Sequence, residues 1–337
     1  MVVSVRDVAA AASVSVGTVS NVLNRPEKVS PATVERVTQA IEELGFVRND
    51  AARQLRAGRS RSIALIVLDS GNPFFAEVAR GAEDRAAESG MSVLLGNSDE
   101  RSDREHAYLE LFREQRVNGV LVTPVDGDLA ALVRLRGGGV PVVLVDHEDS
   151  ASALASVSVD DVEGGYLAVA HLLSTGRRRI AFIGGPQTIR QVADRLEGAR
   201  RAVAEVEAAT LEVIEMSALS VLQGREAGER LRVRPSGERP DAVFAANDLL
   251  AVGALQAFSL MSDVQVPRDI ALIGYDDIDF ASATVVPLSS IRQPAHLIGY
   301  TAVDLLLREL EDPDGAHERT VRFQPELVVR ESTAPAG

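Results

Sequence analysis

The chain has 337 residues, of which 46% are hydrophobic and 25% charged, with no cysteine and a formal net charge of −14 at pH 7. This length and composition predict a globular protein of two or three domains, and the missing cysteines exclude a disulfide framework and a thiolate metal site. No apolar run approaches the roughly 18 residues that cross a bilayer, and the amino terminus lacks a secretory signal pattern, so we expect a cytoplasmic protein.

The charges are unevenly divided along the chain. Residues 1–60 contain eight Arg or Lys and six Asp or Glu, whereas the remainder contains 27 basic and 43 acidic residues. The acidic total argues against a nucleic-acid partner, but that argument does not apply to the first 60 residues. The only lysine is Lys28, which excludes a Walker phosphate loop and Schiff-base chemistry.

The first 45 residues predict three short helices. A capping box at Ser4–Asp7 precedes the first, Ser15 caps the second, and the third begins at Ser30-Pro31 and ends at Gly45. A helix, a tight turn at residues 12–14 and a second helix are typical of the helix-turn-helix, whose second helix enters the major groove of DNA. A generic three-helix bundle is the alternative.

A polar linker at residues 48–62 precedes apolar strands that alternate with amphipathic helices. The predicted strands are Ile63–Leu68, Ser92–Leu95, Gly119–Val122, Val142–Val145, Ser156–Val159, Ile180–Ile183, Glu212–Ile214, Ala242–Ala245, Ala271–Gly274 and Val321–Val329. Continuous apolar strands joined by helices indicate parallel sheets that are buried on both faces. About ten strands are too many for one comfortable sheet, so we expect two α/β lobes.

No constellation of residues predicts catalysis. The histidines, at positions 106, 147, 171, 296 and 317, lack a metal-ligand spacing, and neither G-x-S-x-G nor a G-x-G-x-x-G after a strand occurs. Gly184-Gly185-Pro186 is typical of a turn rather than a phosphate site. We therefore expect neither an enzyme nor a cofactor.

Several segments carry a more specific signal. VRDVAAAASVSVGTVSNVLN, VSPATVERVTQAIEELGF and NDAARQLRAGRS occur in that order before residue 62, and NPFF, RLEGA, AANDLLAVGAL, IGYDD and IRQP follow. This pattern resembles the LacI/GalR (lactose repressor) family over nearly the whole chain. The chain departs from the family at Arg177-Arg178-Arg179, where a Gly-His pair is common.

The resemblance implies an all-α helix-turn-helix head at residues 1–47, a hinge at 48–60, a two-lobed α/β core with parallel sheets like a periplasmic binding protein at 61–331, and a tail at 332–337. One lobe would combine residues 61–160 and 292–320, and the other 161–291 and 321–331.

The resemblance also places residues against DNA. Val16, Gly17 and Asn21 would face the bases, because Asn21 can pair bidentately with adenine and Val16 can touch a thymine methyl group. A mid-helix glycine costs about 1 kcal/mol relative to alanine, which a close approach of Gly17 to DNA would explain. The positions that match phosphate contacts are Ser4, Thr18, Ser20, Asn24, Ser30 and Thr33. Ser4 and Ser30 are equally explained as helix caps.

The linker resembles a hinge that becomes helical on the operator. Leu55 matches a leucine that wedges into the minor groove and kinks the duplex. Ala51, Ala52, Arg53 and Gln54 would pack the paired hinges or touch the groove walls. A flexible tether is the alternative.

The ligand is expected between the lobes, at the carboxyl ends of the strands. Asp276 and Arg195 suit adjacent hydroxyls of a neutral polyol, and Phe74 or Phe75 could stack on a sugar ring, the other being core. The further candidates are His147, Asp160, Gln191, Asn247, Asp248 and Gln293. An interlobe ion pair between Asp276 and Arg195, and a helix cap at Asp248, are the alternatives.

These inferences predict a homodimeric transcription regulator, a repressor, that binds double-stranded operator DNA and a small carbohydrate effector and has no membrane partner. A tetramer is also compatible with the sequence. The competing class is a stand-alone sugar-binding protein of a transport system, which residues 1–60 contradict. The identity of the effector, and whether it induces or co-represses, stay open.

Overall fold

The computed structural model describes residues 3–46, 60–148, 154–259, 264–312 and 319–334. The chain forms two compact units, Met1–Ser60 and Arg61–Gly337, which we call the head and the core. Within the described residues, none of the helices combines the length and the apolar character needed to cross a membrane.

The head contains three α-helices and one short 3-10 helix. They are α1 (Val5–Ala11), α2 (Val16–Asn24), η1 (Pro26–Lys28) and α3 (Pro31–Leu44). The Ser15 hydroxyl accepts a hydrogen bond from the Thr18 amide at 3.0 Å and thereby caps α2. Gly45 ends α3 in the left-handed conformation, with φ 59°. Val8, Val19 and Val37, one from each α-helix, are fully buried between them.

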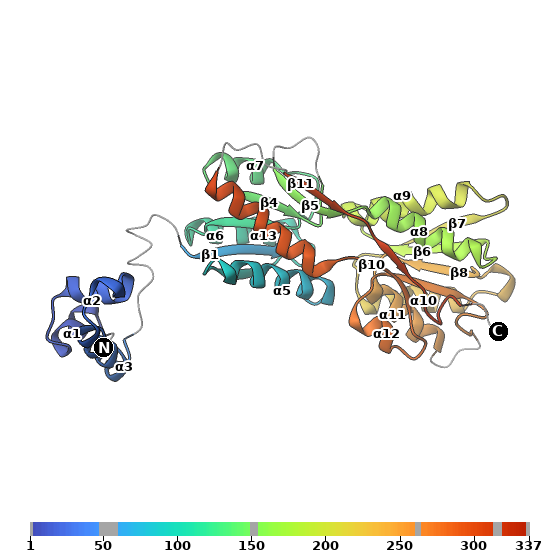
Figure 1. The fold of residues 1–337 in the computed structure, drawn as a ribbon. Coiled ribbons are helices and arrows are strands. Elements are labelled where there is room, and N and C mark those ends of the chain that lie inside the picture. The colour runs from blue at the N-terminus through green and yellow to red at the C-terminus, as the bar shows by residue number, and fades with distance from the viewer. Residues whose placement is uncertain (1–2, 47–59, 149–153, 260–263, 313–318, 335–337) are drawn as a thin grey trace. The chain divides into compact units, whose positions relative to one another are not determined.

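The core consists of two six-stranded sheets, each with helices on both faces (Figure 1). The first sheet has the order β11-β5-β4-β3-β1-β2, and all its pairs are parallel. Its strands are β1 (Ser62–Val67), β2 (Ser92–Asn97), β3 (Gly119–Val122), β4 (Val142–Val145), β5 (Ala155–Val159) and β11 (Thr320–Phe323). Its helices are α5 (Pro73–Glu88), α6 (Ser102–Glu114), α7 (Ala130–Gly137) and α13 (Ala295–Glu311). These elements form the first lobe.

The second sheet has the order β12-β10-β9-β8-β6-β7, and β12 alone runs antiparallel to its neighbour. Its strands are β6 (Arg179–Gly184), β7 (Thr210–Glu215), β8 (Ala242–Ala245), β9 (Ala271–Asp276), β10 (Ser289–Arg292) and β12 (Glu326–Val328). Its helices are α8 (Asp161–Ser174), α9 (Arg190–Ala204), α10 (Val221–Arg232), α11 (Asp248–Ser259) and α12 (Asp279–Ala283), with the short η2 (Ser236–Glu238). These elements form the second lobe. The predicted fold class is confirmed.

The last crossing between the lobes differs from the prediction. The expected single strand Val321–Val329 is two strands, because Pro325 has no amide hydrogen to continue a ladder. Thr320–Phe323 pairs with β5 of the first lobe, so residues 321–323 do not belong to the second lobe as expected. Arg292 pairs with Asp276 and therefore belongs to the second sheet.

The prediction of a tail at residues 332–337 is also wrong for its first two residues. Ser332 and Thr333 are buried, and the Ser332 hydroxyl donates to the Leu272 carbonyl at 2.6 Å. The Thr333 hydroxyl lies 2.7 Å from Nε2 of His171 on α8. Residues 332 and 333 are therefore part of the second lobe.

Glycines allow α8 and α9 to approach each other closely. A Cβ atom added to Gly165 would lie 2.0 Å from the Arg195 carbonyl oxygen, and one added to Gly198 would lie 1.9 Å from the Val162 carbonyl oxygen. Since no side chain larger than hydrogen fits between these backbones, the two helices lock in one register. That register brings the start of α8 next to Arg195.

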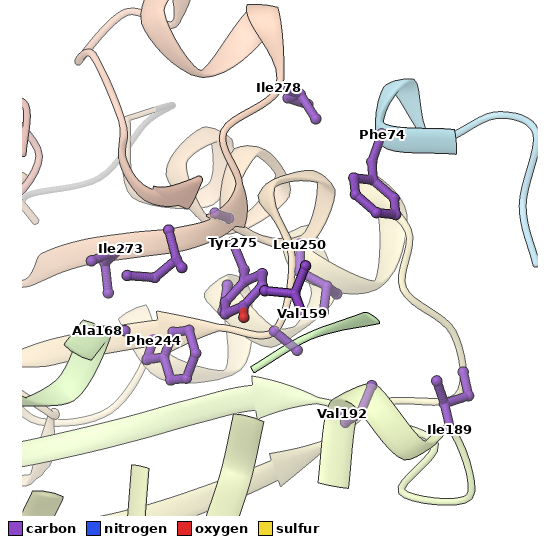
Figure 2. Packing of buried hydrophobic residues seen from close by; sticks show 14 of the residues in the cluster. Phe74, Val159, Ala168, Ile189, Val192, Phe244, Leu250, Ile273, Tyr275 and Ile278 are labelled. Atoms are coloured by element: carbon purple, nitrogen blue, oxygen red, sulfur yellow. The ribbon is translucent and has the colours of Figure 1, made fainter. Parts of the chain in front are cut away.

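The inner strands of the two sheets, such as β3, β4, β8 and β9, are buried on both faces, whereas the edge strands β2, β7, β11 and β12 are partly exposed. In the second lobe the largest fully buried side chain is that of Tyr275, which packs against Phe244 with ring centroids 6.5 Å apart. Figure 2 shows Tyr275 among the apolar side chains of this cluster, which extends to Val159 and Phe74 of the first lobe. The hydrophobic core therefore reaches the region where the lobes meet.

Candidate functional site

Helix α2 of the head exposes the residues that were expected to face the bases. Val16 is 42% exposed, and Gly17 and Asn21 are also exposed, while Val19 and Val22 are buried. A Cβ atom added to Gly17 would meet only the Ser15 hydroxyl, at 3.6 Å. Nothing within the described head therefore requires a glycine at this position.

The hydroxyl and amide side chains expected at the phosphates make local hydrogen bonds at helix ends. The Ser4 amide and hydroxyl both donate to the Asp7 carboxylate, at 2.8 and 2.7 Å, and lower the pKa of Asp7. The Ser30 and Thr33 hydroxyls lie 2.9 Å apart, as do those of Ser15 and Thr18. Asn24 donates to the Ser20 carbonyl at 2.7 Å. The capping explanation of Ser4 is thus correct. Because phosphate oxygens only accept hydrogen bonds, the Ser4 hydroxyl would have to release Asp7 before it could donate to a phosphate.

The hinge residues expected at the minor groove, Ala52, Arg53 and Leu55, lie outside the described residues, as do Ala51 and Gln54.

A cleft lies between the two lobes at the carboxyl ends of their strands. Its empty volume, with the open mouth included, is about 420 Å³. The residues that line it are Leu68, Asp69, Asn72, Phe74, Phe75, Glu100 and Asp146 from the first lobe, and Ile189, Gln191, Arg195, Leu219, Asn247 and Asp276 from the second. Six of the ten residues expected at the ligand, namely Phe74, Phe75, Gln191, Arg195, Asn247 and Asp276, are among them.

Arg195 is the buried cation of the cleft. Its Nε donates to Asp161 Oδ1 at 2.7 Å and its Nη1 donates to the Ala246 carbonyl at 2.7 Å, while its guanidinium carbon lies 3.7 Å from the centre of the Tyr275 ring. Burial acts to lower the pKa of Arg195, but the surrounding acidic groups, led by Asp161, together outweigh it and the pKa is raised. Asp276 is 3.9 Å away. Because Arg195 and Asp276 both belong to the second lobe, they do not form an interlobe ion pair.

Asp276 ends β9 in a conformation that is strained for a residue with a side chain, with φ 108°. Its carboxylate accepts hydrogen bonds from Asn72 Nδ2 at 3.2 Å and from Gln293 Nε2 at 2.8 Å. Burial raises the pKa of Asp276 to about 6, and the nearby Arg195 limits the rise. The Asp276 carboxylate is therefore a buried hydrogen-bond acceptor in the lining of the cleft, and it can gain or lose a proton near neutral pH.

Side-chain hydrogen bonds join the lobes directly. The Asn72 oxygen caps α5 by accepting from the Phe74 amide at 3.0 Å, while its nitrogen donates to Asp276 of the second lobe. On the other side of the cleft, Gln191 Nε2 donates to the Asp146 carbonyl and, at 3.1 Å, to Asp146 Oδ2. A ligand that enters the cleft meets the same groups that hold the lobes together.

The two phenylalanines are both core and lining. Phe74 and Phe75 are 3% and 6% exposed, and their rings meet edge to face with centroids 5.0 Å apart. The expected division into one ligand-facing and one core residue does not describe them.

Four expected residues do not line the cleft. Asp248 accepts from the Ile278 amide at 2.9 Å and from the Ser290 hydroxyl at 2.7 Å, so it orders the segment after β9. The cap of α11 is Asn247, whose oxygen accepts from the Leu250 amide at 2.9 Å, and the suggestion that Asp248 is that cap is wrong.

The other three lie close by. Gln293 reaches the cleft only through its hydrogen bond to Asp276. Asp160 caps α8 at the Glu163 amide and pairs with Arg322 at 2.8 Å. His147 lines a neighbouring pocket, of about 700 Å³ empty volume, that shares Asp146 and Gln191 with the cleft.

The acidic residues by which the first lobe lines the cleft were not predicted from the sequence. Asp146 follows β4 immediately, Asp69 comes two residues after β1, and Glu100 comes three residues after β2. Burial raises the pKa of Glu100 to about 7, against the hydrogen bond that its carboxylate receives from the Leu219 backbone. Polar residues directly after parallel strands are the signal that would have found them, because all such strands end at the same edge of the sheet.

The architecture and the site define a DNA-binding transcriptional regulator with a ligand-binding core. Residues 4–49 match the family described as "Bacterial regulatory proteins, lacI family", and residues 169–333 match "Periplasmic binding protein-like domain". The "HTH-type transcriptional repressor PurR" of Aliivibrio fischeri (strain MJ11) is 34% identical over 332 residues, which are 98% of each chain. The chain therefore belongs to the lacI family of bacterial regulatory proteins, and a stand-alone transport protein is not favoured.

Solved structures agree with this assignment. The lac repressor dimer bound to operator and the anti-inducer ONPF has a TM-score of 0.84 at 28% identity, over 99% of each chain. The transcriptional regulator CelR in complex with cellobiose has a TM-score of 0.70 at 31% identity, over 98% of this chain and 99% of that one. The relatives are named as regulators rather than enzymes.

Proposed function

We propose that this regulator is a cytoplasmic homodimeric repressor whose affinity for a pseudopalindromic operator is set by a hydroxyl-rich small molecule in the interlobe cleft. The observation that carries the proposal is the cleft itself. It combines buried hydrogen-bonding groups of Gln191, Arg195 and Asp276 with two aromatic rings, which is the composition expected of a sugar site. The cellobiose complex of a related regulator supports a carbohydrate.

In the complex with DNA, the bases would contact Val16, Gly17 and Asn21, because α2 exposes these residues to solvent. The phosphate contacts would come from Ser4, Thr18, Ser20, Asn24, Ser30 and Thr33. The hinge would insert Leu55 into the minor groove, beside Ala52 and Arg53. A dimer follows from the symmetry of half-sites about one helical turn apart.

The proposed coupling uses the contacts between the lobes. Asn72–Asp276 and Gln191–Asp146 link the lobes in this structure. A ligand that binds these groups more strongly in one closure than in the other shifts the population of closures by that difference in affinity. The position of the lobes in the dimer would then decide whether both hinges fold on DNA.

The test is a thermal-shift screen of the full chain with pentoses, hexoses, disaccharides and polyols. A compound that raises the melting temperature of the wild type should give no shift with Asp276→Ala, because the carboxylate at the edge of the cleft is gone. Asp279→Ala, an exposed residue of α12, is the matched control and should keep the shift. An undiminished shift with Asp276→Ala would remove Asp276 from the site.

A further inference from the structure

The charges of the cleft do not balance. The carboxylates that line it are those of Asp69, Glu100, Asp146 and Asp276. Among the described residues of the lining, Arg195 is the single basic one, and its Nε is already held by Asp161 at 2.7 Å. When the four carboxyl groups are ionised they therefore outnumber the cation of the lining, and a positively charged ligand would favour that ionised form.

A second, independent observation concerns two buried acceptor atoms. Among the described residues, Asp146 Oδ1 and Gln191 Oε1 have no hydrogen-bond partner, although each residue is only 4% exposed and lines the cleft. The Gln191 amide nitrogen is engaged by Asp146, so neither residue can supply a donor to the other's free oxygen. Buried acceptors of this kind are normally satisfied, by protein groups, ordered water or a bound ligand, and a ligand in the cleft can supply the donor here.

The chemistry of the missing donor follows from these two facts. A hydroxyl group brings one hydrogen and two lone pairs, whereas an ammonium group brings three hydrogens, no acceptor and a positive charge. Charge-assisted hydrogen bonds to a carboxylate are also roughly twice as strong as neutral ones. A site with free acceptors and surplus negative charge therefore favours an ammonium group and disfavours phosphorylated or carboxylated sugars.

We propose that the effector is an amino sugar or a related amino polyol, whose ammonium group binds against Asp146 and Gln191 while its hydroxyls face Asp276. This inference rests on the proposed function, since it assumes that the cleft binds the effector. It adds the charge of the ligand and the residues that recognise that charge.

The experiment compares matched pairs of probes by isothermal titration calorimetry on the full chain. The pairs are glucosamine and glucose, galactosamine and galactose, and mannosamine and mannose, each with its neutral N-acetyl derivative. At least one amine should bind ten or more times more tightly than its neutral partners. Equal or tighter binding of the neutral partners would overturn the proposal and leave the proposed polyol site standing, whereas no binding in any pair would reject both.

Two variants locate the charge recognition. Asp146→Asn keeps the shape of the residue, and asparagine tolerates the positive φ of 53° at this position. It should reduce the ratio of the amine's affinity to the neutral partner's affinity at least tenfold. Asp103→Asn, an exposed residue on α6 that is not part of the lining, removes the same charge and should leave the preference unchanged. If Asp146→Asn does not fold, Glu100→Gln should show a smaller loss of the preference in the same direction. A preference that survives in Asp146→Asn, or in Glu100→Gln if that variant has to replace it, would contradict the assignment.

Discussion

At the scale of single residues, Gly17 lowers the stability of its helix without any contact in the described head that requires a glycine. Such a residue favours an interaction with a partner outside the chain. The residue lies within the exposed face of α2, and an added methyl group would meet only open space beyond the Ser15 hydroxyl. Gly17 is the second residue of α2, so its cost relative to alanine is at most the roughly 1 kcal/mol of a helix interior, and the proposed approach of DNA to the helix backbone would explain its presence.

Gly17→Ala should therefore stabilise the head and weaken operator binding at the same time. We expect hydrogen-exchange protection of the α2 amides to rise by up to about 1 kcal/mol. Operator affinity, measured by anisotropy at fixed salt, should fall. Thr38→Ala on the exposed face of α3 is a control that raises helix propensity without a change in affinity. Unchanged operator affinity for Gly17→Ala would remove Gly17 from the interface.

The burial of Asp276 lowers the stability of the folded protein by an amount that depends on pH. Its pKa in the folded protein is about 6, above the ordinary value of 3.8, so between these values the folded state binds a proton that the unfolded state has released. Stability from this group is therefore highest at low pH and falls as pH rises through about 6, by up to roughly 3 kcal/mol. Burial raises the pKa of Asp146 and Asp248 as well, in the same direction.

Urea unfolding of the ligand-free chain at pH 5 and pH 8 measures this effect. The wild type should be more stable at pH 5, and Asp276→Asn should show a smaller difference between the two pH values because its side chain does not ionise. Asp279→Asn, which is exposed, serves as the control. A pH dependence that is the same in Asp276→Asn and the wild type would show that Asp276 does not carry the raised pKa.

At the scale of secondary-structure elements, the α8–α9 pair determines where the charged residues of the cleft lie. Helix α8 supplies Asp161 and α9 supplies Arg195, and Gly164 on α8 leaves room for the Tyr275 hydroxyl, which a Cβ atom would approach to 2.1 Å. The Tyr275 ring in turn supports the Arg195 guanidinium.

Gly164→Ala should push α8 away from β9 and disturb this stack. We expect a loss of about 1–3 kcal/mol in the free energy of unfolding, as is usual for overpacking a core, together with weaker effector binding. Gly137→Ala at the end of α7, where an added Cβ meets nothing within 4 Å, is the matched control in denaturant titrations. Wild-type stability of Gly164→Ala would show that the helix pair is more compliant than its packing indicates.

The elements were largely predictable from the sequence because each depends on local pattern. A four-residue run of β-branched and apolar residues such as Val142–Val145 favours a buried strand, and Ser15 caps α2 as its position before Val16 predicts. The split of Val321–Val329 was missed although Pro325 marks it, because the apolar pattern continues across the proline. The burial of Ser332 and Thr333 has no local signal, since it depends on partners at Leu272 and His171.

The candidate site was predictable only in part for the same reason. Asp276 and Arg195 were found through the family resemblance, but the partner of Arg195 is Asp161, and the partner of Asp276 across the lobes is Asn72, 204 residues away in sequence. Asp248 is of a residue type that often binds ligands. Its carboxylate, however, already accepts hydrogen bonds from the Ile278 amide and the Ser290 hydroxyl. Such assignments depend on which side chains meet in three dimensions.

At the scale of the whole molecule, a basic head and an acidic core divide the work of DNA binding and ligand sensing. The surplus of acidic residues lies after residue 60, and four of these residues line the cleft. The central claim is that occupancy of this cleft changes operator affinity at the head.

The measurement that tests this claim most directly is a fluorescence-anisotropy titration of the full chain with its selected operator, at fixed salt, with and without a saturating effector. The wild type should change its operator Kd at least tenfold when the effector is added, whereas Asp276→Ala should have the ligand-free Kd of the wild type and no response. An operator Kd that the effector leaves unchanged in the wild type, or shifts equally in Asp276→Ala, would contradict the account.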